Sequence, residues 1–358
     1  MNDFDINDMR LEKEFKGITF SKYKRSEAKK ELLNSLNNGK IEHALNWSAE
    51  FICSGLFIEL WDIILYFVGK HIHLANPKLP SYLELRFTNF KEIVKGGYTG
   101  FEINMRNNDK IRKLFAEIII VICKSKKKHS IESVKIKKEE FDMTTMSSKL
   151  KAPNVNYVTN IFKPDDPKEL FIAVNEFMYH ISKDSCNSLE ACYWFEWIIE
   201  FDNLCKKRKE PCVCERRKFV NADEKYQKEP IWIIWDALFY FSSLHKCDIC
   251  KKIIKSIFEL FSIRYTSSAK TKRKYLIYFA ISVITENVNT TAAIIEDKQI
   301  IDNITQKINL IYKEIKKNEV SPAMDYLFKG VEKSNREKTV EKLDKMNTIN
   351  TVIRSYPK

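Results

Sequence analysis

Glycine is scarce in this chain of 358 residues: eight occur, and only Gly330 follows residue 100. Strand-rich folds and nucleotide-binding α/β folds use glycine in turns and phosphate loops. The chain also lacks the phosphate-loop pattern G-x-x-x-x-G-K-[ST], the dinucleotide pattern G-x-G-x-x-G and the hydrolase motifs H-E-x-x-H and G-x-S-x-G. These absences argue against a Rossmann or P-loop domain and favour helices joined by short polar links.

Long apolar runs without charge are also missing. The most apolar stretch, residues 51–69, could cross a bilayer by its length, but Glu59 and Asp62 lie near its middle. Each carboxylate costs roughly 2.5–3.5 kcal/mol at a bilayer centre. The cost of the two carboxylates about offsets the free energy gained by inserting the apolar residues around them. The chain opens on a polar, acidic segment, so we expect no secretory signal and nine reduced cysteines. The sequence therefore predicts no membrane insertion and no disulfide framework.

Helical periodicity runs through most of the chain. Apolar residues recur at three- and four-residue spacing, and the 44% hydrophobic content is enough to bury a core. The pattern predicts an all-α fold, either a helical array or two helical lobes with short connections. The expected parts are a flexible N-terminal arm (1–20), an N-terminal helical domain (21–123), a basic linker (124–166), a C-terminal helical domain (167–317) and a polar tail (318–358).

The stretch LNWSAEFICSGLFIELW, residues 45–61, is predicted to form two helices that meet at a corner. Ser54 and Gly55 interrupt the helical pattern, and glycine suits the left-handed conformation that ends many helices. Alternatively, Cys53 on a sharp turn could be a nucleophile. That chemistry needs a base and a group to orient it, and the sequence indicates neither.

Two pairs of polar residues are weaker candidates for chemistry. His71 and His73 could share a metal on a strand, but their side chains would diverge at a helix end. Glu196 and Glu200, four residues apart on a helix, suit acid–base work or pairing with lysines on the helix surface. Neither pair has a further partner at a suitable spacing, so we predict that the protein is not an enzyme.

Four cysteines have spacings that suggest a metal site. Cys212 and Cys214 form a C-x-C pair, and Cys247 and Cys250 form a C-x-x-C pair. Together they could complete a tetrahedral zinc site. The C-x-C spacing is unusual for zinc, and the second pair lies in a segment with helical periodicity, so exposed or half-buried thiols are the alternative. Zinc is the one cofactor that the sequence suggests.

The net charge of +13 is concentrated in three segments. Residues 124–151, 205–218 and 264–274 each carry +5, and the other 305 residues sum to −2. Clustered cations between helices are typical of a surface that follows a phosphate backbone, so the pattern predicts nucleic-acid binding. Solvated loops, or a basic surface for an acidic protein, would give the same pattern. The candidate nucleic-acid-binding residues are Lys126, Lys127, Lys128, Lys206, Lys207, Arg208, Lys209, Arg216, Arg217, Lys270, Lys272, Arg273 and Lys274.

Aromatic residues flank the last basic segment. Tyr265, Tyr275 and Tyr278 could stack on bases, although their spacing is more typical of a helical core. The sequence does not distinguish DNA from RNA.

Residues 35–80 resemble the helical collar of clamp-loader-related AAA+ ATPases of the replication-associated recombination type. In that family a G-x-x-x-x-A-L-x-W helix leads through a small-residue corner to a helix ending in an L-A-[ND]-P turn. The resemblance implies oligomerisation or partner docking, and not ATP hydrolysis, because no ATPase module is expected in the 34 residues before it. The matching residues are Gly39, Ala44, Leu45, Trp47, Gly55, Leu74, Ala75, Asn76 and Pro77.

A second resemblance extends over most of the chain. The segments LNWSAEFICSG, KHIHLANPKLP, MRNNDKIRKLFAE, KAPNVNY, DDPKELFIAVNEF and YLIYFAISVITE look like a conserved protein family of nucleocytoplasmic large DNA viruses, the giant viruses. That family has no assigned catalytic residues. The resemblance implies a viral protein located in the host cytoplasm, within a viral factory, or in the virion.

These observations together predict a non-enzymatic viral protein that binds nucleic acid as an accessory or scaffold in replication or transcription. One alternative is a virion structural protein or interaction scaffold whose basic surface meets an acidic protein partner. The other is an enzyme of unrecognised type.

Overall fold

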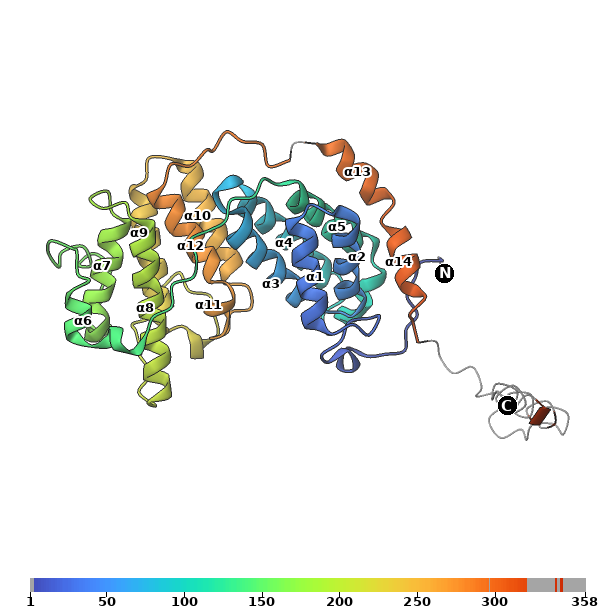
Figure 1. Ribbon diagram of the computed structural model, residues 1–358, viewed down its shortest axis with the longest axis horizontal. Coiled ribbons are helices and arrows are strands. Elements are labelled where there is room, and N and C mark those ends of the chain that lie inside the picture. The colour runs from blue at the N-terminus through green and yellow to red at the C-terminus, as the bar shows by residue number, and fades with distance from the viewer. Residues whose placement is uncertain (1–2, 296, 321–338, 340–341, 344–358) are drawn as a thin grey trace, which may run out of the picture. The chain divides into compact units, whose positions relative to one another are not determined.

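The structure, a computed structural model, describes residues 3–295, 297–320, 339 and 342–343. Most of the predicted polar tail lies outside these residues. Among these residues, 3–6 and 10–319 form one compact unit by their contacts, and residues 7–9 and 320 belong to a second. The first unit contains the fourteen α-helices of the described ranges (Figure 1).

The regular secondary structure of the described residues is helical, with no sheet, so the prediction of an all-α fold is confirmed. Ile18 and Lys24 make one isolated antiparallel bridge. The first helices are α1 (Arg25–Asn37), α2 (Ile41–Cys53), α3 (Phe57–Phe67), α4 (Leu79–Lys95) and α5 (Asp109–Lys124). The later helices are α6 (Met143–Ser147), α7 (Phe171–Ile181), α8 (Ser188–Lys207), α9 (Ile231–Leu244), α10 (Asp248–Phe261), α11 (Ala269–Lys272), α12 (Lys274–Thr285), α13 (Lys298–Gln306) and α14 (Asn309–Lys316). The short helices are η1 (Glu12–Phe15), η2 (Val68–Ile72), η3 (His73–Ala75), η4 (Glu102–Asn107), η5 (Lys138–Phe141), η6 (Lys168–Leu170) and η7 (Glu224–Tyr226).

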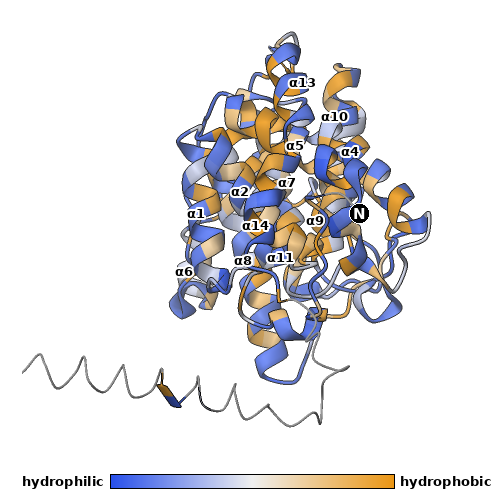
Figure 2. Cartoon of the chain, turned by 90° about the vertical axis from the view of Figure 1, so that its right-hand side faces the viewer, coloured by the Kyte–Doolittle hydropathy of each residue, from blue (hydrophilic) through white to orange (hydrophobic). Residues whose placement is uncertain are grey.

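The two helical regions expected from the sequence pack against each other. Helix α10 packs on α4, and α12 packs on α3 and η2. Gly69 permits one of these contacts, because a Cβ at its position would lie 2.9 Å from the backbone carbonyl carbon of Tyr275. Helices α13 and α14 return to pack on α5 and α2. Figure 2 shows the apolar residues gathered where the helices face one another, with hydrophilic loops outside.

The predicted corner forms between α2 and α3. Gly55 has a φ of +74°, and its N–H donates to the carbonyl of Ile52. A Cβ at this position would lie 3.3 Å from the side chain of Ile103. Glycine therefore avoids both the strain that a side chain would cause at this positive φ and a close contact with Ile103.

Replacing Gly55 with valine is expected to destabilise the fold by roughly 1–3 kcal/mol, because valine is strained at positive φ and crowds Ile103. Thermal unfolding measures the effect. Gly17→Val is the matched control, since Gly17 has a φ of +82° but open space around its Cβ. Gly17→Val therefore measures the cost of backbone strain at positive φ without the cost of a close contact. An unchanged melting temperature for Gly55→Val would contradict this description of the corner.

The apolar stretch 51–69 is divided by this corner into parts of α2, α3 and η2. Among the described residues, no helix has both the length and the apolar character needed to cross a membrane. The two acids that weakened the membrane interpretation have partners: Glu59 pairs with Arg25 at 3.3 Å and Asp62 with Arg273 at 2.8 Å.

Much of the segment predicted as a flexible arm is packed into the first unit. Ile6, Phe15 and Phe20 are buried. The guanidinium of Arg10 lies 4.9 Å from the ring centre of Phe15 and 4.8 Å from that of Phe20. These three buried residues are nine and five positions apart, which is not helical spacing, so their pattern did not indicate packing.

The segment predicted as a basic linker also lies against helices. The backbone N–H groups of Lys128 and Ser130 donate to the carbonyls of His71 and Lys70, at 3.0 and 2.8 Å. Further along, the indole of Trp197 in α8 donates to the carbonyl of Glu140 at 3.1 Å. In Figure 1 this segment runs from the end of α5 past α12 to α8.

Candidate functional site

The thirteen candidate nucleic-acid-binding residues divide by exposure. Arg217, Lys270 and Arg273 are buried. Lys127, Lys206 and Lys274 are half-buried. The exposed residues are Lys126, Lys128, Lys207, Arg208, Lys209, Arg216 and Lys272.

Arg217 is held in a buried ion pair. Its guanidinium donates to both carboxylate oxygens of Asp166, at 2.5 and 2.6 Å, and to Asp236 at 3.1 Å. It also donates to the carbonyl of Ile161 at 3.1 Å. The side chains of Arg217 and Asp166 are 1% and 0% exposed. Arg217 therefore joins the segment before α7 to α9 and does not reach the surface.

A buried ionic network joins the second and third basic segments. Lys270 of α11 and Lys206 of α8 both bind the carboxylate of Asp202, Lys206 at 3.0 Å. Lys206 also binds Glu229 at 2.9 Å, and the hydroxyl of Tyr265 donates to the same carboxylate at 2.7 Å. The network therefore holds α8, α11 and the start of α9 together, and it places the two basic segments side by side.

Three other candidates also have structural partners. Arg273 binds Asp62 and donates to the carbonyls of Phe261 and Ile263. The ammonium of Lys127 donates to three carbonyls at the end of α5. Lys274 of α12 binds Glu196 at 2.8 Å, so the lysine that pairs with this glutamate comes from another helix and not from the surface of α8.

Three exposed cations follow Lys206 in the sequence and lie at the end of α8. Lys207, Arg208 and Lys209, here called the α8 cations, come directly after the inward-facing Lys206. Lys209 has a φ of +65°, its N–H donates to the carbonyl of Lys206, and the N–H of Glu210 donates to that of Cys205. This is the Schellman pattern of a helix end, so the backbone beneath the α8 cations is fixed. Among the described residues none of the three makes an ion pair.

The three tyrosines of the last basic segment belong to the core. Tyr265, Tyr275 and Tyr278 are 4%, 6% and 0% exposed. The ring of Tyr265 lies 4.7 Å from that of Trp232. The core alternative is therefore the one the structure supports, and these rings are not accessible for stacking on bases.

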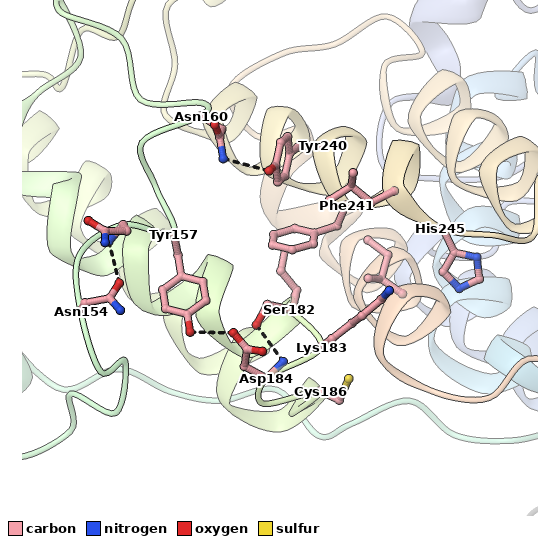
Figure 3. Close-up of a pocket in the computed structure, with 14 residues that line it drawn as sticks. Asn154, Tyr157, Asn160, Ser182, Lys183, Asp184, Cys186, Tyr240, Phe241 and His245 are labelled. Carbon is pink, nitrogen blue, oxygen red and sulfur yellow. Dashed lines mark hydrogen bonds between the residues drawn. The ribbon is translucent and has the colours of Figure 1, made fainter.

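A pocket of about 600 Å³ lies between residues 154–160, the link after α7 and the end of α9 (Figure 3). No motif in the sequence indicates it. In its wall the hydroxyl of Tyr157 donates to Asp184 at 2.7 Å, and the amide of Asn160 donates to the hydroxyl of Tyr240 at 2.8 Å. The hydrogen bond to Asp184 raises the pKa of Tyr157 to about 12, so this tyrosine stays a donor at neutral pH. Aromatic faces and amides in one pocket suit a flat polar ring such as a nucleobase.

The cysteines do not assemble as predicted, although all nine are free thiols. Cys247 and Cys250 lie together, but the third neighbouring ligand atom belongs to His245 and not to Cys212 or Cys214. The thiol of Cys212 interacts instead with that of Cys205, and the N–H of Cys214 donates to the carbonyl of Lys228. The structure therefore does not bring the four predicted cysteines together in the described residues. The C-x-C pair is held by another segment of chain.

His71 and His73 diverge, as expected for a helix end. The Nδ1 of His71 lies 3.0 Å from the Nδ1 of His129. His73 is 1% exposed, its ring lies 4.9 Å from that of Phe279, and neither ring nitrogen has a hydrogen-bond partner among the described residues. Burial lowers the pKa of His73 to about 4, although the carboxylate of Glu286 opposes this shift.

Acidification is expected to destabilise the protein through His73. In the unfolded chain a histidine has a pKa of about 6.5, so between about pH 6.5 and 4 the unfolded chain binds a proton that the folded protein excludes. The free energy of unfolding should fall by up to about 3 kcal/mol over this range. Burial also lowers the pKa of His71 to about 4, so His73→Asn, which also tolerates the φ of +47°, should flatten the pH profile of the melting temperature in part. The exposed His43→Asn is the control, and equal profiles for both variants would contradict this assignment.

Comparisons with protein-family models, with curated proteins and with solved structures find no match for this chain. The resemblances to an AAA+ collar and to a giant-virus family therefore stay predictions.

Proposed function

We propose that this protein binds nucleic acid through the α8 cations, as a non-enzymatic accessory or scaffold protein in viral replication or transcription. The observation that carries the proposal is the network around Asp202. It anchors Lys206 and Lys270 inside the fold and leaves Lys207, Arg208 and Lys209 exposed beside a second basic segment.

The local geometry suits contacts to a phosphate backbone. Three consecutive cations on a fixed helix end can reach neighbouring phosphates, and each contact releases condensed counterions. Lys272, two residues after the anchored Lys270, and Arg216, beside the buried Arg217, add exposed charge on the connected segments. Glu210 directly follows the α8 cations and is exposed, but one acid beside three cations leaves the local net charge positive.

The first basic segment can contribute through Lys126 and Lys128. Lys126 is exposed, and Lys128 is paired with Glu286 at 3.1 Å while its side chain stays 52% exposed. An exposed ion pair contributes at most about 1 kcal/mol, so Lys128 can exchange Glu286 for a phosphate at little cost. The viral setting of the proposal rests on the resemblance described above.

Fluorescence anisotropy with labelled single- and double-stranded DNA and RNA at about 50 mM salt tests the proposal. We expect binding to at least one of the four forms, displaced by unlabelled nucleic acid but poorly by polyglutamate of equal charge. Absence of binding to all four would overturn the proposal. Equal displacement by polyglutamate would instead favour an acidic protein partner.

A further inference from the structure

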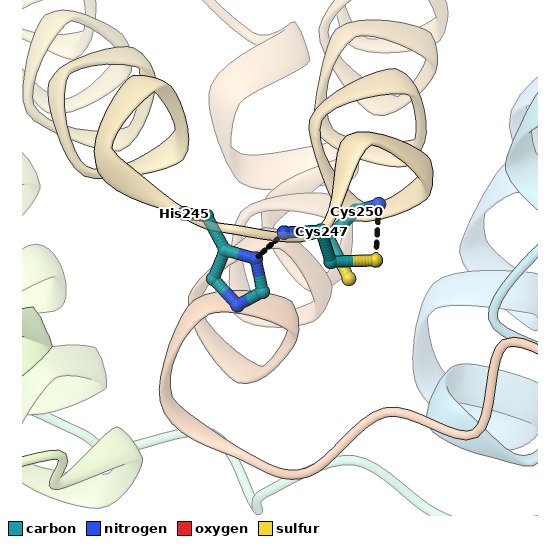
Figure 4. Close-up of side chains that lie close together, drawn as sticks. All are labelled: His245, Cys247 and Cys250. Atoms are coloured by element: carbon teal, nitrogen blue, oxygen red, sulfur yellow. Dashed lines mark hydrogen bonds between the residues drawn. The ribbon is translucent and has the colours of Figure 1, made fainter.

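Three side chains with metal-binding atoms converge on the link between α9 and α10. His245, Cys247 and Cys250 each place one ligand atom within 4.8 Å of the other two, and no other His/Cys/Asp/Glu trio in the described ranges does so. Figure 4 shows the imidazole and the two thiols on the same side of this link. The trio is independent of the basic segments and of the proposed function.

The local backbone holds two of these side chains in place. Cys247 is the N-cap of α10, and its Sγ accepts the N–H of Cys250 at 3.4 Å. The N–H of Cys247 in turn donates to Nδ1 of His245 at 3.1 Å. This hydrogen bond orients the imidazole, and an ion bound at Nδ1 would take the lone pair that now accepts the N–H of Cys247.

Burial shapes how an ion could enter. Cys250 is 2% exposed, whereas Cys247 and His245 are half-buried, so the trio is open to solvent on one side. His245 also lines the pocket of Figure 3. Three protein ligands leave the fourth position of a tetrahedral ion to water or to an external donor.

We propose that His245, Cys247 and Cys250 bind one thiophilic divalent ion of the zinc class. Two thiols and an imidazole are ligands that Zn²⁺ prefers, and the distances allow one ion to contact all three. A C-x-x-C pair at the start of a helix also suits a reversible disulfide. The imidazole beside the two sulfurs favours a metal site over a disulfide, because a disulfide bond involves the two sulfurs alone.

Metal ions bind the thiolate form of cysteine, so binding releases protons and the affinity should rise with pH.

Anaerobic titration of the reduced protein with Co²⁺ tests the site, because tetrahedral Co²⁺ bound by thiolates has characteristic charge-transfer and d–d absorption. We expect one Co²⁺ per chain, displaced by Zn²⁺. Cys247→Ser and His245→Asn should each weaken binding at least about tenfold. Both positions are half-buried, so these variants should fold, and circular dichroism checks this; Cys250→Ser is the more disruptive third variant.

The matched control is Cys212→Ser together with Cys214→Ser, which should leave the spectrum and the affinity unchanged. Loss of the spectrum in this control would move the site to the other cysteines. Absence of a thiolate–cobalt spectrum in the wild-type protein, or an unchanged affinity in folded His245→Asn, would overturn the proposal. So would a Cys247–Cys250 disulfide whose reduction restores no Co²⁺ binding.

Discussion

Replacing Arg217 with methionine is expected to lower the free energy of unfolding by about 3–5 kcal/mol, one of the largest effects of any single substitution. Methionine fills similar space but leaves the carboxylate of Asp166 buried without its bidentate partner. The side chain of Asp166 is 0% exposed, so water cannot replace the lost hydrogen bonds without opening the structure. Urea denaturation followed by tryptophan fluorescence measures the change.

The neighbouring residue provides a control for the same substitution. Arg216 is exposed, and Arg216→Met should change the stability by less than about 0.5 kcal/mol. Adding Asp166→Leu to Arg217→Met should recover part of the loss, because it removes the unpaired buried charge. A loss below about 1 kcal/mol for Arg217→Met would contradict the structural role of this arginine.

The second large effect is expected on binding. Changing Lys207, Arg208 and Lys209 together to glutamine should weaken binding to the preferred nucleic acid by roughly 10²–10³-fold at about 0.1 M salt. For each phosphate contact, the affinity rises close to tenfold when the salt concentration falls tenfold. The variant removes up to three such contacts, so at about 0.1 M salt it loses up to three of these factors. Anisotropy titrations of the variant and the wild-type protein give the ratio.

A charge-matched control separates local contacts from net charge. Lys30, Lys40 and Lys95 are exposed and lie outside the three basic segments, so their triple glutamine variant has the same net charge. It should bind within about threefold of the wild-type protein. Equal losses in the two triple variants would mean that total charge, and not the end of α8, determines binding.

The fold could be predicted from the sequence because its determinants are local. The helices follow from three- and four-residue spacing and from few glycines after residue 100, and the α2–α3 corner follows from Ser54 and Gly55. The packing of residues 3–6 and 10–20 could not be predicted in this way. Their burial depends on partners far along the chain, such as the amide of Asn107, which binds the backbone of Ile6.

The basic segments could be located from the sequence, but the exposure of each cation could not. Charge counts do not reveal the partners Asp166, Asp202 and Asp62, which lie 51, 68 and 211 residues from Arg217, Lys270 and Arg273. These acids belong to the nearly neutral remainder of the sequence. Only tertiary packing separates the cations that stabilise the fold from those that remain exposed.

The cysteine cluster and the pocket differ in how far they could be predicted from the sequence. His245 lies two residues before Cys247, so the sequence contains the pattern H-x-C-x-x-C, but the spacing of the cysteines alone does not indicate the histidine as a ligand. The pocket has no comparable signal. Its walls come from residues 154–160, 181–186 and 240–245, which meet only in the folded chain.

The central claim is that exposed cations at the end of α8 bind a phosphate backbone, and the salt dependence of binding tests it most directly. The account predicts that the logarithm of the affinity falls linearly with the logarithm of salt concentration, with a slope of about −3 or steeper, since each phosphate contact contributes about −0.9 on double-stranded DNA. The α8 triple variant should reduce the steepness by about 2–3. A slope near zero, or a slope that the α8 triple variant leaves unchanged, would contradict the account.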